Sequence, residues 1–240
     1  MKIALLGYGK MGHAIEEIAL QRDHEVVCKV GIENLEDRTA ENIQKADVVI
    51  EFTGPDSAFD NVKLCLDAGV PVVCGSTGWL AKFEEAKKYC QQKNGGFLYA
   101  SNFSVGVNIF FAVNKKLAEL MSGQPEYEVS MKEIHHTQKI DAPSGTAITL
   151  AEQVMKALPG KKKWVNHPSD NSNELVILSE RVDPAPGTHS ITYSSDIDEI
   201  CITHTARSRK GFATGAVIAA EFLAKNKQGV FSMQDVLGIK

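Results

Sequence analysis

The N-terminus of the chain reads as a strand, a glycine-rich turn and a helix in immediate succession. Residues 2–6 form an apolar run typical of a buried strand, and residues 14–20 carry apolar side chains at helical spacing. Between them stands Gly7-Tyr8-Gly9-Lys10-Met11-Gly12. A G-x-G-x-x-G turn in this context is typical of a dinucleotide-binding βαβ unit. The sequence therefore predicts a dinucleotide site at residues 7–12, with a glycine turn that binds nothing as the alternative.

The segment after the second predicted strand, residues 24–30, bears on the choice between NADH and NADPH. An acidic residue there usually binds the ribose hydroxyls, whereas a basic residue accepts a 2′-phosphate. Glu33 follows the strand about two residues late, and Lys29 lies within it. Neither residue matches the pattern, so the choice stays open.

Strand-like and helical runs alternate through the first hundred residues. Further strands are predicted at 47–53, 71–74 and 97–99, with helices between them. This alternation indicates a doubly wound parallel sheet, whose ligands lie outside the carboxyl ends of its strands. Small and polar residues follow those ends and are candidates to contact a nicotinamide ribose, although they would also serve as plain turns. They are Phe52-Thr53-Gly54, Gly75-Ser76-Thr77 and Ala100-Ser101-Asn102-Phe103.

The pattern changes after a predicted helix at 105–121. Tyr127, Val129 and Met131 alternate with polar residues, as in a sheet with one wet face, and three further strands are predicted at 174–182, 187–194 and 198–206. Helical spacing returns at 214–223. We therefore expect a Rossmann-type α/β domain from residues 1–105 with 212–240. Residues 106–211 would form an α+β domain with a largely antiparallel sheet, which carries His135 and His136.

Composition excludes several classes of protein. The 240 residues are 43% hydrophobic and 23% charged, as in ordinary globular proteins, and the net charge of −4 is unsuited to nucleic acid. No apolar stretch approaches the length of a membrane span, and the first residues lead directly into a strand. The five cysteines include no C-x-x-C pair and lie in apolar runs, which predicts buried, reduced thiols in the cytoplasm.

Residues 133–147 concentrate groups that suit acid–base chemistry. His135 and His136 titrate near neutral pH, and Lys139 follows His135 at a spacing that aligns the two side chains on a helix or a strand. Ser144 is a candidate helix N-cap, which would leave the N–H groups of Gly145 and Thr146 free to bind an anion. The set predicts an acid–base enzyme for a small acidic substrate, with solvated side chains and a plain helix cap as the alternative. Adjacent histidines without a second ligand pair predict no metal site.

Over essentially its whole length the chain resembles the bacterial 4-hydroxy-tetrahydrodipicolinate reductases of lysine and diaminopimelate synthesis. The resemblance rests on the glycine turn, Glu51-Phe52-Thr53, Gly75-Ser76-Thr77-Gly78, residues 102–108 and above all residues 133–147. It implies a cytoplasmic homotetramer that assembles through the sheets of the second domain. One departure is Asp183, which follows Arg181 where family members often have glycine.

The resemblance also implies roles for individual residues. His135 would protonate the substrate ring with Lys139 as its catalytic partner, and the dicarboxylate would be held by His136, Lys139, Ser144, Gly145 and Thr146. NADH or NADPH would be bound by residues 7–12, Gly75, Ser76, Thr77, Ala100, Ser101, Asn102 and Phe103. Two other functions remain open: another two-domain nicotinamide oxidoreductase of amino-acid metabolism, and a nucleotide-sensing protein without catalysis.

Overall fold

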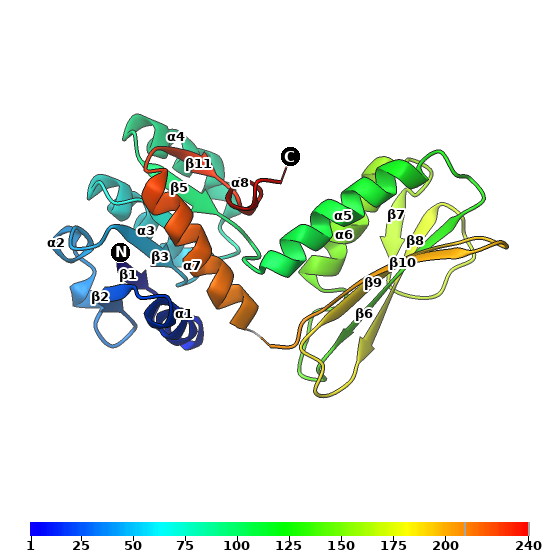
Figure 1. Cartoon of the computed structure of the whole chain (residues 1–240), viewed down its shortest axis with the longest axis horizontal. Helices are drawn as coiled ribbons and strands as arrows, with labels where there is room; N and C mark the ends of the chain where they lie inside the picture. The colour runs from blue at the N-terminus through cyan, green and yellow to red at the C-terminus, as the bar shows by residue number, and fades with distance from the viewer. Residues whose placement is uncertain (209, 240) are drawn as a thin grey trace. The chain divides into compact units, whose positions relative to one another are not determined.

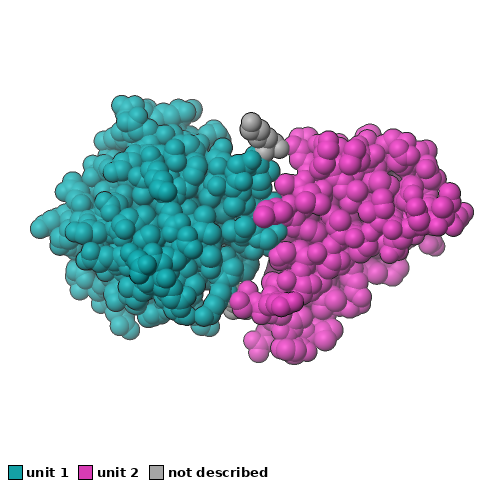
Figure 2. Space-filling model, in the orientation of Figure 1, with its two compact units in different colours: residues 1–108, 210–240 teal, residues 109–209 magenta. Residues whose placement is uncertain are grey.

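The computed structural model describes residues 1–208 and 210–239. The chain divides into two compact units, which Figure 2 shows in separate colours. Unit 1 consists of Met1–Asn108 and Lys210–Lys240, and unit 2 of Ile109–Arg209. Each unit has its own sheet and its own hydrophobic core.

Unit 1 is built on a six-stranded sheet in which every pairing is parallel (Figure 1), so the predicted Rossmann-type sheet is confirmed. Along the sheet the strands are β11 (Gly229–Phe231), β5 (Gly96–Tyr99), β4 (Val72–Cys74), β3 (Val48–Glu51), β1 (Lys2–Leu6) and β2 (Glu25–Val30). The chain builds the sheet outward in both directions from β1. Ligands of such sheets bind at the carboxyl edge where the order reverses, which is between β1 and β3.

Helices cover both faces of this sheet. One face carries α2 (Ala40–Ile43), α3 (Pro55–Asp67) and α4 (Phe83–Gln92), and the other carries α1 (Lys10–Gln21), α7 (Lys210–Lys225) and α8 (Met233–Leu237). Short 3-10 helices, η1 (Leu35–Asp37) and η2 (Leu80–Lys82), lie in the connections. Within β1, Ala4 and Leu6 pack in one core while Ile3 and Leu5 pack in the other. Burial on both faces explains why the strands are apolar without alternation.

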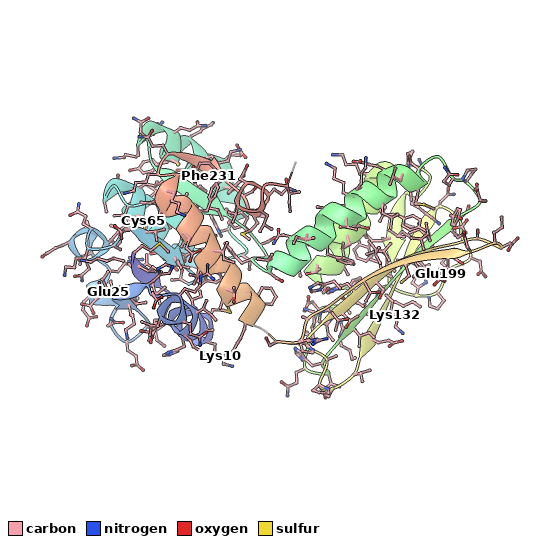
Figure 3. All side chains as sticks on the ribbon, viewed as in Figure 1. Lys10, Glu25, Cys65, Lys132, Glu199 and Phe231 are labelled. Carbon is pink, nitrogen blue, oxygen red and sulfur yellow. The ribbon has the colours of Figure 1, made fainter. Side chains whose placement is uncertain are left out.

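Unit 2 is a five-stranded sheet covered on one face by two helices. Its strand order is β10 (Glu199–Thr205), β9 (Thr188–Ser194), β6 (Glu128–His135), β8 (Glu174–Arg181) and β7 (Lys163–Val165). Helices α5 (Val105–Met121) and α6 (Gly145–Ala157) contribute apolar side chains to a core with Val129 and Met131. Lys132 on β6 and Glu199 on β10, both labelled in Figure 3, are exposed, so the predicted wet face is confirmed.

The second sheet is mixed rather than largely antiparallel. Strand β9 pairs antiparallel with β6 and β10, but β8 pairs parallel with both β6 and β7. The parallel pairing follows from the connection between β6 and β8, because it contains the 13-residue helix α6 and can return the chain to the end of the sheet where it began.

Three of the five cysteines, including Cys65 within unit 1 (Figure 3), are buried, as predicted. The prediction is wrong for two: Cys28 is half-buried and Cys201 is exposed on the edge strand β10. Across the part of the chain that is described, no helix combines the length and apolar character needed to span a membrane.

Candidate active site

The glycine turn after β1 depends on close backbone contacts. Gly7 has φ +96°, and a Cβ built on it would lie 2.2 Å from the carbonyl oxygen of Phe52. A Cβ on Gly12 would lie 2.6 Å from the carbonyl oxygen of Gly7. Gly9 is different, since it is the N-cap of α1 and its Cβ position has no neighbour within 4 Å. Gly7 and Gly12 therefore build the turn, whereas Gly9 leaves open space in front of it.

That space belongs to a cavity of about 700 Å³ at the carboxyl edge of the sheet. Segments that follow β1, β2 and β3 line it, and among the predicted residues these include Gly7, Tyr8 and Gly9. The cavity lies where the strand order reverses, the usual place for a nucleotide in such a sheet. Lys10, Met11 and Gly12 form the first turn of α1 beside it.

The other predicted cofactor residues follow the carboxyl ends of β4 and β5. Gly75 allows the ring of Phe52 to approach, because a Cβ there would lie 2.2 Å from that ring. Phe103 is buried and packs near Phe52, with ring centroids 5.5 Å apart. Of the remaining residues, Ser76 is buried, Ala100 and Asn102 are half-buried, and Thr77 and Ser101 are exposed.

The cavity contains both an acidic and a basic candidate for recognition of the adenosine ribose. Glu33 lines it, while Lys29 forms an ion pair with Glu16 at 3.2 Å and lies over the ring of Tyr8. Sequence reasoning overlooked Arg38, which also lines the cavity and donates to Asn61 at 3.1 Å. Its position just after η1, well beyond β2, gave no signal in a motif that places this residue at the end of the strand.

The buried carboxylate of Glu51 organises the same edge of the sheet. It is 0% exposed at the end of β3 and accepts hydrogen bonds from the backbone N–H of Thr53 and from the hydroxyl of Ser76 at 3.0 Å. The thiol of Cys74 also donates to it, at 2.9 Å. The hydroxyl proton of Ser76 is therefore already donated within the protein, and Glu51 links the ends of β3 and β4.

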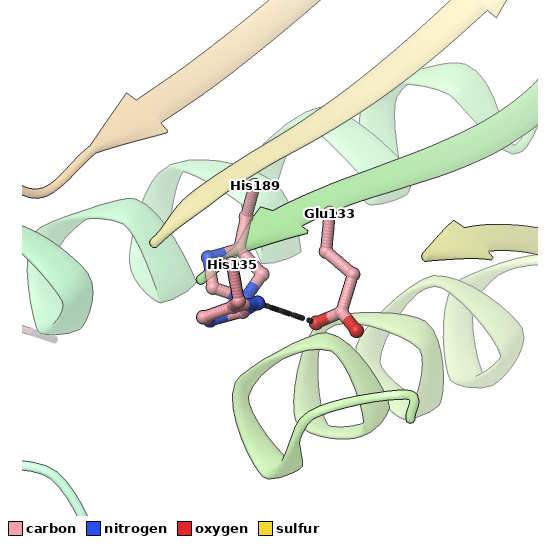
Figure 4. A group of neighbouring side chains, drawn as sticks. All are labelled: Glu133, His135 and His189. Carbon is pink, nitrogen blue, oxygen red and sulfur yellow. Dashed lines mark ion pairs between the residues drawn. The ribbon is translucent and has the colours of Figure 1, made fainter. Parts of the chain in front are cut away.

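In unit 2, the carboxyl end of β6 brings together three buried side chains. Glu133 and His135 lie two residues apart on one face of the strand, and Glu133 stands opposite His189 in the pairing of β6 with β9. Nδ1 of His135 is 3.4 Å from Oε2 of Glu133, and Nε2 of His189 is 3.6 Å from the same oxygen. Figure 4 shows the three side chains converging. The neighbours of His135 in this cluster, Glu133 and His189, are thus residues that sequence reasoning did not single out.

Glu133 remains ionised although it is 0% exposed. Its carboxylate accepts hydrogen bonds from the backbone N–H of Ser144 at 3.1 Å, from the hydroxyl of Ser179 at 2.8 Å and from Arg181 at 3.3 Å. Burial alone would raise the pKa of Glu133, but the contacts of His189, Ser144 and Ser179 outweigh burial and hold the pKa well below its ordinary value.

His135 is shifted in the same direction for a different reason. The residue is only 7% exposed, and burial lowers its pKa from 6.5 to about 4, against the opposing charge of Glu133. Its Nε2 atom faces Gly187, where a built Cβ would lie 3.1 Å away. At neutral pH the ring of the ligand-free protein is therefore uncharged, and Gly187 gives it room.

Lys139 lies in the loop after β6, so the helical or strand spacing that aligned it with His135 does not apply. Its ammonium group pairs with Asp141 at 2.7 Å. Arg181 braces this loop by donating to the carbonyl oxygens of Lys139 at 3.3 Å and Asp141 at 2.7 Å. His136, half-buried, opens the loop.

The predicted helix cap at Ser144 is confirmed. Its hydroxyl accepts the N–H of Ala147 at 3.2 Å, and α6 begins at Gly145. The first N–H groups of a helix have no acceptor within it, so those of Gly145 and Thr146 remain available at its end. The backbone N–H of Ser144 binds Glu133, which places this helix end beside the Glu133–His135 pair.

Both parts of the chain match families of known proteins. Residues 1–103 match the family described as "Dihydrodipicolinate reductase, N-terminus", and residues 106–237 match "Dihydrodipicolinate reductase, C-terminus". The chain is 49% identical over 237 residues to the 4-hydroxy-tetrahydrodipicolinate reductase of Christiangramia forsetii, with 99% of this chain and 98% of the relative covered. Identity to the enzyme of the same name from Methanosarcina acetivorans is 34%, covering 89% and 82% of the two chains.

The fold is also found in solved structures. Dipicolinate-bound dihydrodipicolinate reductase from Paenisporosarcina sp. TG-14 superposes with a TM-score of 0.77 and 22% identity, over 98% of each chain. A probable dehydrogenase from Thermotoga maritima follows at a TM-score of 0.58 and 11% identity, over 100% of this chain and 93% of that one. The matches over both domains and the identity to curated relatives place the chain in the dihydrodipicolinate reductase family.

Proposed function

We propose that this protein reduces 4-hydroxy-tetrahydrodipicolinate with NADH or NADPH, as a step of lysine and diaminopimelate synthesis. Its relatives carry the name of this reductase. The observation that carries the proposal is the buried imidazole of His135, 3.4 Å from the carboxylate of Glu133 and beside the open N-terminus of α6. A proton donor and an anion site therefore stand next to each other.

The dicarboxylate binds at the start of α6 in this proposal. The N–H groups of Gly145 and Thr146 donate to one carboxylate, where the helix dipole adds to the attraction. Lys139 and His136, on the loop after β6, supply further donors to the substrate. Ser144 contributes by capping the helix, because its hydroxyl already accepts from Ala147.

His135 delivers the proton. The pKa of about 4 in the ligand-free protein leaves the ring uncharged near neutral pH. A bound dianion raises that pKa, since negative charge beside the ring favours the imidazolium form. His135 is therefore protonated when substrate is bound, and Glu133 stabilises its imidazolium form. Lys139 offsets negative charge on the substrate.

The cofactor, when bound, supplies the hydride. The cavity of unit 1 holds its pyrophosphate at the Gly7–Gly12 turn, and residues 75–77 and 100–103 contact the nicotinamide nucleotide. Glu33 and Arg38 both line this cavity. We propose that Glu33 accepts hydrogen bonds from the ribose of NADH and that Arg38 binds the 2′-phosphate of NADPH. Calorimetric titration of each nucleotide into wild-type protein and Arg38→Ala tests this, because only NADPH should bind more weakly to the variant.

Measurements of turnover with different substrates distinguish the three candidate functions. The purified protein should oxidise reduced nicotinamide when given the condensation product of pyruvate and aspartate semialdehyde made in situ by the aldolase. Oxidation with other amino or keto acids, but not with this product, would favour a different two-domain oxidoreductase. Nucleotide binding without any turnover would favour the sensing protein.

We also propose a cytoplasmic homotetramer. Leu178 on β8 is 40% exposed and stands opposite Lys132, so it lies on the face of the sheet that α5 and α6 do not cover. Association through this face would remove Leu178 from water. Light scattering coupled to size-exclusion chromatography would report four chains per particle, and a Leu178→Lys variant should dissociate.

A further inference from the structure

One ring nitrogen in unit 2 is buried without a hydrogen-bond partner. Among the described residues, Nδ1 of His135 has no donor or acceptor in hydrogen-bonding geometry, although Oε2 of Glu133 lies 3.4 Å away. Buried polar atoms almost always have a partner, so an unpartnered ring nitrogen is a candidate ligand for an ion. Because His135 is 7% exposed, bulk water does not satisfy this nitrogen.

A second imidazole faces the same carboxylate oxygen. Nε2 of His189 lies 3.6 Å from Oε2 of Glu133, and His189 is 6% exposed. The three ligand atoms all lie within 4.8 Å of one another. Figure 4 shows the three side chains. The other oxygen of Glu133 accepts from Ser179 and Arg181, while Oε2 accepts the backbone N–H of Ser144 at 3.1 Å and also faces the two rings.

The spacing of these atoms is wider than that of a well-formed hydrogen bond and suits a bridging ion. A direct N–H···O bond would bring the heavy atoms to about 2.9 Å. Zinc binds nitrogen and carboxylate oxygen at about 2.0–2.2 Å in tetrahedral geometry, which places neighbouring ligand atoms about 3.4 Å apart. The observed 3.4 and 3.6 Å agree with this value. We propose that Glu133, His135 and His189 form a binding site for a divalent transition-metal ion, with zinc as the best fit.

The surroundings define what kind of site this is. Ser179 and Arg181 orient the carboxylate in the way that outer-shell residues orient metal ligands. The hydroxyl of Ser144, 3.0 Å from Nε2 of His189, must turn aside when the ion binds. The two rings must also rotate slightly, so that Nδ1 of His135 and Nε2 of His189 come as close to each other as each is to Glu133. The positive charge of Arg181 opposes a dication, so binding is weaker than at a structural zinc site. Three protein ligands leave a fourth position for water or a carboxylate.

Occupancy has a consequence for the proposed reaction. A metal ion on Nδ1 of His135 prevents the ring from carrying a second proton and so removes the proton donor. Zinc is therefore an inhibitor, and removal of zinc restores activity. The inhibition rests on the proposed function, but the binding does not, so the two are measured separately.

Binding is tested on metal-free protein by calorimetric titration with zinc chloride and by the absorption of bound cobalt(II). No dicarboxylate is added, because such a molecule chelates zinc itself. We expect one ion per chain and a tetrahedral cobalt spectrum. His189→Gln and Glu133→Gln should each weaken zinc binding at least tenfold. His136→Gln removes the adjacent histidine outside the cluster, and Cys201→Ser removes the exposed thiol; both should bind zinc as the wild type does.

Several outcomes would overturn the proposal. These are no zinc binding by the wild type, undiminished binding by His189→Gln and Glu133→Gln, or loss of binding on Cys201→Ser. Circular dichroism and nucleotide affinity report whether each variant is folded. If the cluster variants fail to fold, the cobalt spectrum of the wild type decides, and an octahedral or thiolate-type spectrum counts against the site. Zinc binding with no reductase turnover would leave the metal site standing and reject the reaction.

Discussion

Oε2 of Glu133 and Nδ1 of His135 lie 3.4 Å apart at the buried end of β6. Burial by itself raises the pKa of Glu133 and lowers the pKa of His135. Burial opposes the charge of both, but hydrogen-bond donors surround Glu133 and keep it ionised, while His135 loses its proton. A fixed anion beside a neutral imidazole is an arrangement that can take up a proton when a second anion arrives.

The first prediction concerns stability in acid. The pKa of His135 is 6.5 unfolded and about 4 folded, so the unfolded chain binds the proton first and stability falls as pH drops through this window. The loss reaches about 3 kcal/mol near pH 4. The lowered pKa of Glu133 adds a further loss only below its ordinary value of 4.5. Urea unfolding at several pH values should show the loss between about pH 6.5 and 4.5 in the wild type and a smaller one in His135→Gln. The same dependence of stability on pH in both proteins would contradict the lowered pKa of His135.

The second prediction concerns Gly187. Its φ is +154°, and an added Cβ would lie 3.1 Å from Nε2 of His135, so Gly187→Ala should displace the imidazole. We expect kcat to fall about tenfold or more, as for a misplaced catalytic group, with nucleotide affinity unchanged. Gly160→Ala is the control, because that position has open space and an ordinary φ. If both variants keep full kcat, the ring does not depend on the room that Gly187 provides.

A third prediction tests the anion site. Gly145→Pro removes one N–H at the first position of α6, where proline is well tolerated. KM for the dicarboxylate should rise by about tenfold, the effect of one lost hydrogen bond to a charged group. Gly145→Ala keeps the N–H and adds a methyl group into open space, so its KM should stay near that of the wild type. Equal KM values for the proline and alanine variants would exclude a role for this N–H.

A fourth prediction tests the nucleotide site. Gly9→Val places a branched side chain in space that is open in the protein but lies in the cavity, so folding should be retained and affinity for both nucleotides lost. Gly123→Val, also at an open position but outside the cavity, is the matched control. Calorimetric titration of NADH and NADPH into the two variants measures these affinities. Unchanged nucleotide affinity of Gly9→Val would mean that residues 7–12 form only a turn.

Local patterns in the sequence predicted local structure well. The strand, glycine turn and helix at residues 2–20 are present, with Gly7 and Gly12 in close backbone contacts. The cap at Ser144 is present because a serine hydroxyl can satisfy an N–H three residues on, which is a relationship within one segment.

Relationships across the sheets could not be predicted in the same way. His189 reaches His135 only through the pairing of β9 with β6, and Arg181 braces the loop of Lys139 from β8. Register and strand direction decide these contacts, and the parallel pairing of β8 with β6 was not anticipated. Arg38 lines the cavity of unit 1 from its position just after η1, which no spacing rule describes.

His135 donates the proton in the proposed reaction, and kcat of His135→Gln at saturating substrate and nucleotide tests this role most directly. Glutamine keeps polarity and approximate size but cannot supply a proton at neutral pH, so kcat should fall by about 10²–10⁴ while nucleotide affinity holds. Lys139→Met should also lower kcat, and the double variant should lose less than the product of the two single losses. Near-normal kcat in a folded His135→Gln protein would contradict the assignment.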